Sequence, residues 1–131
     1  MMARQTLEQQ RAAYAWTAAR RAQHGFCRLD DLRHLTKGAH ALITGQGLMP
    51  ALALYASRKA DPCAELLGDT IRGWLNERFG AQAVLGCPGP ATYAELMDRL
   101  LRSPSAFHMQ AMDETLALLK WLHQFAAALG R

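Results

Sequence analysis

Four polar or basic side chains recur at helical spacing along one stretch of the chain: Arg33, Lys37, His40 and Thr44. At about 100° per residue they share a narrow arc of a helix, opposite an apolar stripe that includes Leu32. The arc contains no acidic residue, so we expect its charge to remain unpaired within the helix. Such a face can contact phosphate groups. The alternative is an ordinary solvated helix face.

Two further basic pairs stand near predicted helix ends, Arg20-Arg21 and Arg58-Lys59. They extend the basic surface in one interpretation, and in the other they only complement the negative ends of their helices. Trp16 shares the polar side of its helix with Arg20. It is a candidate anchor for a partner protein, or a residue packed by a neighbouring helix.

Other reactive residue types lack the spacing that catalysis or metal binding requires. Gly45-Gln46-Gly47 has neither the third glycine of a dinucleotide site nor the Gly-Lys pair of a phosphate loop, so we interpret it as a helix-to-helix corner. The five histidines include no pair four residues apart, and the three cysteines are far apart, which favours free thiols. We expect no active site, metal, cofactor or small-molecule substrate.

Six predicted helices position the basic residues and Trp16. Local residue patterns predict where these helices begin and end. Thr6 with Gln9 and Thr92 with Glu95 have the spacing of capping boxes, and Asp30 and Asp61 are predicted N-caps. Pro50 and Pro62 are predicted to lie in the first turns of their helices. The predicted helices cover about 6–23, 30–44, 48–59, 61–79, 92–102 and 104–129. No alternating β-branched segment interrupts them. The sequence therefore predicts an all-α, single-domain bundle over residues 1–131, with short connections and one longer loop near residues 80–91.

The predicted core positions follow the helical period. Leu96, Leu100 and Leu101 are expected to point inward from the fifth helix. The charged residues of the fourth helix, which include Arg72 and Arg78, alternate in sign and predict an exposed face.

Composition is that of an ordinary globular protein. Of 131 residues, 50% are hydrophobic and the net charge is +4, with arginine supplying twelve of the fifteen basic residues. A modest positive charge is compatible with a nucleic-acid partner without requiring one. No apolar run is long enough for a membrane helix or a signal peptide, so we expect a cytoplasmic protein without membrane contact.

Several short motifs occur in an order that is similar to a known family. An Arg-Ala-x-x-Ala pattern (Arg11–Ala15) is followed by the corner Gly47-Leu48 and by Ala51–Tyr55 with Lys59. Later positions complete the order with Trp74-Leu75, Glu114, Trp121-Leu122 and Phe125-Ala126. Over about residues 11–126 the chain resembles the fifth, small helical subunit of the Cmr complex, the type III-B CRISPR RAMP-module effector. It departs from the family at His123-Gln124, where a more basic pair is usual.

The resemblance implies a non-catalytic subunit in antiviral defence. Copies of it stack in a minor filament beside other Cmr subunits and help hold the guide–target RNA duplex. The candidate RNA-binding residues are then Arg33, Lys37, Arg20, Arg21, Arg58 and Lys59.

Two alternatives remain open. The first is a protein–protein scaffold without RNA contact, in which Trp16 anchors a partner. The second is a small helical nucleic-acid-binding regulator, for which the segment Leu48–Ser57 offers few polar side chains to read bases.

Overall fold

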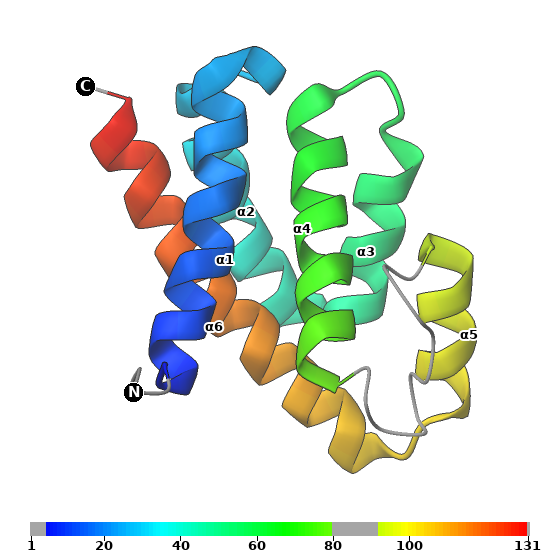
Figure 1. The fold of residues 1–131 in the computed structure, drawn as a ribbon. Coiled ribbons are helices and arrows are strands. Elements are labelled where there is room, and N and C mark those ends of the chain that lie inside the picture. Colours follow the sequence, from blue (N-terminus) through cyan, green and yellow to red (C-terminus); the bar gives the residue numbers. More distant parts are fainter. Residues whose placement is uncertain (1–4, 80–91, 131) are drawn as a thin grey trace.

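The computed structural model describes residues 5–79 and 92–130. Within them the chain is helical throughout, with no strand, which confirms the predicted all-α class (Figure 1). The elements, in chain order, are α1 (Leu7–Arg21), the short π-helix η1 (Ala22–Phe26), α2 (Leu29–Gln46), α3 (Leu48–Ser57), α4 (Pro62–Phe79), α5 (Tyr93–Arg102) and α6 (Ser105–Leu129). The predicted loop near residues 80–91 lies outside the described residues.

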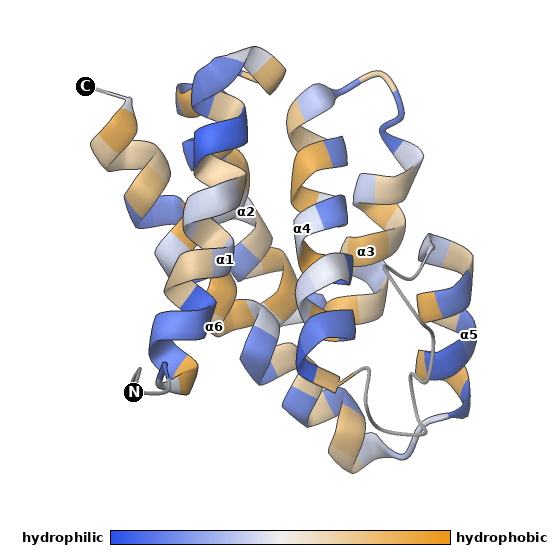
Figure 2. Cartoon of the chain, in the orientation of Figure 1, coloured by the Kyte–Doolittle hydropathy of each residue, from blue (hydrophilic) through white to orange (hydrophobic). Residues whose placement is uncertain are grey.

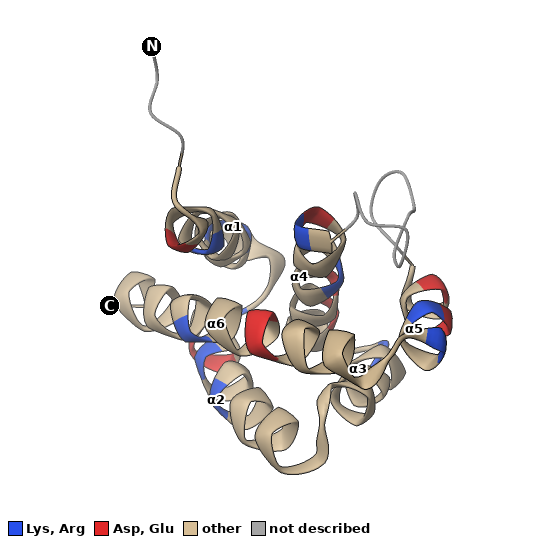
Figure 3. Ribbon diagram, turned by 90° about the horizontal axis from the view of Figure 1, so that it is seen from below, with Lys and Arg blue, Asp and Glu red and all other residues tan. Residues whose placement is uncertain are grey.

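The long helix α6 is the central element of the bundle. It packs against both α1 and α2, which lie on either side of it when the molecule is seen from below (Figure 3). Helix α4 contacts α1, α2, α3 and α6, and α5 lies at the edge beside α3. This arrangement leaves one side of α2 and the outer side of α5 toward solvent.

Local sequence accounts for most helix starts. Thr6 accepts a hydrogen bond from the Gln9 amide while the Gln9 side chain accepts one from the Thr6 amide, and Thr92 and Glu95 form the same capping box. The Asp61 carboxylate accepts from the amides of Cys63 and Ala64 at the start of α4. Three of the four predicted caps are therefore confirmed.

The predicted N-cap at Asp30 is wrong. Helix α2 begins at Leu29, so Asp30 and Asp31 lie in its first turn, where carboxylates still favour the positive end of the helix dipole. Its cap residue is Arg28, which makes no side-chain capping bond. Asp30 therefore lies within the helix, one turn before Arg33.

The corner between α2 and α3 depends on one glycine. Gly47 has φ +100°, a conformation that a side chain would strain, whereas Gly45 lies within α2. Pro50 falls in the first turn of α3, as predicted, where its missing N–H leaves no carbonyl without a partner. The Gly45–Pro50 segment is thus an architectural joint.

Alanine and leucine supply most of the core, together with Trp74 and the aromatic rings of Phe79 and Phe107. Figure 2 shows the hydrophobic residues on the helix sides that meet within the bundle. Leu96 and Leu100 are buried as predicted, but Leu101 is 68% exposed. The error arises because Leu101 lies about 100° around the short helix from Leu100, beyond the side that faces the core.

Candidate nucleic-acid interface

The predicted basic face of α2 lies on the outside of the bundle. Lys37 and His40 are exposed, and Arg33 is partly exposed. The buried residues of α2 are others, Leu32, Thr36, Ala39 and Ile43. Lys37 makes no ion pair with any residue of the described segments. Its ammonium group is therefore available to an anionic partner.

Arg33 differs from the prediction, because it has an acidic neighbour. Its Nη2 donates to Asp30 Oδ1 across 2.8 Å, a contact one helical turn long. The hydrogen bond from Arg33 lowers the pKa of Asp30. The expectation that the charge is unpaired within the helix is thus wrong for Arg33. Both groups remain in water, so the contact is a weak surface pair that a phosphate can replace.

A histidine of α6 holds this part of α2 in place. His123 Nδ1 lies 3.1 Å from the carbonyl oxygen of Arg33 and 3.2 Å from Thr36 Oγ1. Thr36 is buried, so the contact lies between the two helices. The backbone that carries Arg33 is thereby fixed to α6, while the guanidinium remains on the outside.

Arg20 and Arg21 belong to another part of the molecule. The Arg20 guanidinium lies 5.7 Å from the centre of the Trp16 ring, and that of Arg21 lies 4.7 Å from the centre of the Phe26 ring. Because α6 lies between α1 and α2 (Figure 3), these two arginines and the α2 face occupy different sides of α6. The six basic residues are thus distributed over α1, α2 and the segment that follows α3. Their contact with RNA stays a prediction.

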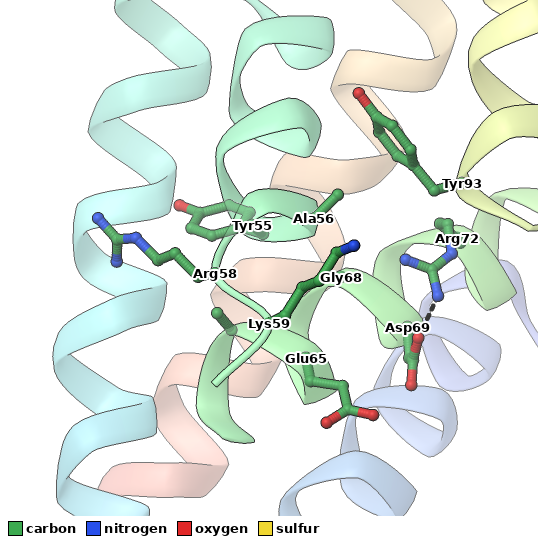
Figure 4. A pocket seen from close by; sticks show the side chains of 10 residues that line it. Tyr55, Ala56, Arg58, Lys59, Glu65, Gly68, Asp69, Arg72 and Tyr93 are labelled. Atoms are coloured by element: carbon green, nitrogen blue, oxygen red, sulfur yellow. Dashed lines mark hydrogen bonds and ion pairs between the residues drawn. The ribbon is translucent and has the colours of Figure 1, made fainter. Parts of the chain in front are cut away.

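Arg58 and Lys59 follow α3 and point in different directions. Figure 4 shows the Arg58 guanidinium beside α2, whereas Lys59 extends into a pocket between α3, α4 and α5. Arg58 and Lys59 both line this pocket, although only the Lys59 ammonium group is turned toward Tyr93 in Figure 4.

Trp16 is packed and exposed at once. Its ring meets Phe125 of α6 edge-on with centroids 5.1 Å apart, and Phe125 in turn lies 5.5 Å from Trp121. Even so, 40% of Trp16 is exposed. The structure thus contains the packing by a neighbouring helix that the sequence left open, and the role of Trp16 as a partner anchor stays a prediction.

Sequence reasoning missed a buried charge cluster that joins α1, α4 and α6. Glu114 is only 5% exposed, and it accepts hydrogen bonds from Arg11 (Nε 2.9 Å, Nη2 2.6 Å), Arg78 (Nε 3.3 Å) and Trp74 (Nε1 3.2 Å). Burial acts to raise the pKa of Glu114, but the hydrogen bonds and charges of Arg11, Trp74 and Arg78 outweigh it and lower the pKa. The predicted exposed face of α4 is therefore wrong for Arg78. The available signal was the register of Glu114, three residues after Ala111 on the apolar stripe of α6.

The two cysteines within the described segments are free thiols, as predicted, and Cys87 lies outside those segments. Burial and the neighbouring Cys63 thiol raise the pKa of Cys27 to about 12, so Cys27 stays protonated at neutral pH. A low-pKa nucleophilic thiol is thus absent at this position.

Histidine, cysteine and acidic side chains do not gather at one place within residues 5–79 and 92–130. No group of three or more His, Cys, Asp or Glu side chains there has the arrangement of a metal site. None of these helices combines the length and the apolar character that crossing a bilayer requires.

Comparison with protein-family models identifies the family of the chain. No curated protein matches the chain. The model of a family described as CRISPR-associated protein (Cas_Cmr5) matches residues 7–129, which includes all seven helical elements of the described structure. It spans the motifs from Arg11 to Ala126 on which the resemblance rests. The chain therefore belongs to the Cas_Cmr5 family of CRISPR-associated proteins, the small helical subunits of the type III-B Cmr complex.

Proposed function

We propose that the chain is a non-catalytic subunit that stacks with copies of itself in a filament of the Cmr complex and helps hold the guide–target RNA duplex. The observation that carries the RNA contact is the outer face of α2. Lys37 is exposed there without an ion pair to any described residue, beside Arg33, whose partner is the solvent-exposed Asp30. Other Cmr subunits and further copies of the chain are its protein partners.

Electrostatic attraction supplies the mechanism. Each phosphate neutralised by Arg or Lys releases condensed counterions, so affinity falls with salt, with a slope of about 0.7 per contact on a single strand. One copy offers few such contacts, so an isolated subunit binds RNA weakly. Stacked copies present the same face repeatedly, and the contacts then add along the strand.

The test replaces both residues in the assembled complex. Arg33→Glu with Lys37→Glu should lower the capture of target RNA and flatten its salt dependence, while assembly on a sizing column stays unchanged. Lys120→Glu is the control, because Lys120 is an exposed lysine on α6. Unchanged capture by the double variant would remove α2 from the RNA contact.

A scaffold role without RNA is the second candidate, and Trp16 favours it. A large aromatic side chain that is partly exposed and supported from behind by Phe125 resembles the anchors found at protein interfaces. Trp16→Ala should then reduce incorporation into the complex, and ultraviolet crosslinking of the wild-type complex should give no RNA adduct on α2. Adducts on α2 exclude this candidate.

A further inference from the structure

An open pocket of about 290 Å³ lies between α3, α4 and α5, on the side of α3 away from the α2 face. Its floor is made of small residues of α3 and α4, including Ala56, Ala64 and Gly68. Tyr93, the first residue of α5, forms one wall and is only partly buried. The pocket is thus shallow, apolar at its base and bordered by an aromatic ring.

Two cations reach into the same space. Figure 4 shows the Lys59 ammonium and the Arg72 guanidinium on the side of the pocket that faces Tyr93, with the carboxylate of Glu65 pointing away from it. Arg72 pairs with Asp69 through Nη2. Its Nε is buried and has no hydrogen-bond partner. A buried donor of this kind is uncommon in native proteins and indicates that a further acceptor belongs nearby.

Gly68 keeps room for the guanidinium. A Cβ built at this position would lie 3.4 Å from Arg72 Nη1 and 3.9 Å from the Tyr55 side chain. The absence of a side chain there leaves the floor open beneath the cation. The local sequence therefore favours an open site at the cost of helix propensity in α4.

The aromatic ring of Tyr93 and the two cations have the chemistry needed to bind the base and the phosphate of one nucleotide of a single strand. Unstacked bases pack on tyrosine rings, and phosphates bind to arginine and lysine. We propose that this pocket receives one unpaired nucleotide of the bound RNA, with the base against Tyr93 and its phosphate between Lys59 and Arg72. The proposal rests on the RNA-contacting function above and adds a second contact to it. Arg58 also lines the pocket, so a third cation lies at its border.

The test uses the reconstituted complex and a target RNA that carries 4-thiouridine at single positions. Irradiation should attach the RNA to the peptide containing Tyr93. Tyr93→Leu should lower the capture of target RNA about fivefold or more without changing its salt slope, since no charge is lost. Tyr93→Phe should bind as wild type, because stacking needs the ring and not the hydroxyl. Lys59→Ala should lower both affinity and slope, and Lys120→Ala should change neither.

If a Tyr93 variant folds poorly, Gly68→Ala offers a second test, because it alters the pocket without changing Tyr93. The added methyl group occupies the pocket floor, leaves the charge unchanged and should raise the melting temperature, so weaker RNA capture then reports on the pocket alone. Gly38→Ala is its matched control on the open surface of α2, where nothing lies within 4 Å of the added Cβ. Equal capture by these two variants contradicts the pocket.

The outcomes distinguish a failure of the pocket proposal from a failure of the proposed RNA-contacting function. If Arg33→Glu with Lys37→Glu weakens capture while Tyr93→Leu and Lys59→Ala do not, the pocket proposal is wrong and the function stands. If none of these variants weakens capture, both are wrong. Attachment of the 4-thiouridine RNA to other peptides, and at no position to the peptide containing Tyr93, also overturns the pocket.

Discussion

Inside the bundle, Arg11 donates to Glu114 across 2.9 and 2.6 Å; on the surface of α2, Arg33 donates to Asp30 across 2.8 Å. The chemical groups and distances are similar. The first contact joins residues 103 positions apart, however, and connects α1 to α6, whereas the second spans three residues of one helix. Glu114 is sheltered from water and Asp30 is not.

Solvent decides what each contact can do. Removing one partner of a buried pair leaves an uncompensated charge, so the cluster around Glu114 fixes the relative positions of three helices. The exposed pair contributes little to folding, because water solvates either group when the contact opens. Arg33 can therefore exchange its carboxylate for a phosphate at little energetic cost, and Arg11 cannot.

The largest expected effect is the loss of the buried carboxylate. Glu114→Gln should lower the free energy of unfolding by about 3 kcal/mol, at the low end for buried pairs because Arg11 and Arg78 keep partial access to water. Urea unfolding followed by circular dichroism measures it. Asp113→Asn, at the exposed neighbouring position, is the control and should change little. A loss below about 1 kcal/mol would show that the two ion pairs do not differ in kind.

Acid should reproduce part of that loss. The pKa of Glu114 in the folded protein is lower than its ordinary value of 4.5, so the unfolded chain binds the proton more tightly. Its stabilising contribution is complete at neutral pH, begins to fall as the pH approaches 4.5, and disappears as the pH passes below the folded pKa. Unfolding midpoints in urea from pH 7 to pH 3 should therefore fall more steeply for wild type than for Glu114→Gln. If the midpoints of wild type and Glu114→Gln fall in parallel with pH, Glu114 is not the group responsible for the loss of stability in acid.

Two glycines test how closely each region is packed. A Cβ at Gly73 overlaps the Tyr14 hydroxyl, which α1 places against α4, so Gly73→Ala should cost about 1–2 kcal/mol of stability. Gly38→Ala on the α2 surface meets nothing within 4 Å and should stabilise by about 1 kcal/mol. Tyr14→Phe in the Gly73→Ala background should recover part of the loss, because it removes the overlapping oxygen. Equal changes in stability for Gly73→Ala and Gly38→Ala would contradict the difference in packing between the two regions.

The smallest effect on stability should come from Asp30→Asn. The melting temperature should fall only slightly, and no further than in Asp31→Asn, because each variant removes one first-turn carboxylate and the ion pair with Arg33 is solvated. Capture of target RNA by the assembled complex should increase, since Arg33 no longer has a competing carboxylate. Asp31→Asn, in the same turn, is the matched control. A melting temperature lower than that of Asp31→Asn together with unchanged capture would mean that the pair serves the fold.

Much of the fold followed from local sequence. The capping boxes at Thr6 and Thr92, the Asp61-Pro62 start and the glycine corner at Gly47 each depend on a few neighbouring residues, and each formed as predicted. The errors also have local causes. A one-residue shift moved Asp30 from the cap into the first turn, and a 100° step carried Leu101 to the surface.

The candidate RNA-binding residues and the pocket could be predicted from the sequence only in part. The sequence identified the basic residues of α2, but not that Arg33 has an acidic partner, since that depends on where α2 begins. Arg72 and Tyr93 belong to helices separated along the chain, so no spacing rule brings them to one pocket. Arg11, Arg78 and Glu114 converge for the same reason only in the folded bundle.

The sequence by itself determined the helical class, most helix boundaries, the basic face of α2 and the family, because periodicity, caps and motif order are properties of neighbouring residues. The tertiary structure decided which charges are buried and which remain in water. It also decided that Lys59 and Arg72 share a pocket with Tyr93, although the three residues lie on different elements. Charges acquire these different roles through packing, since exposure to water depends on helices brought together from distant parts of the chain.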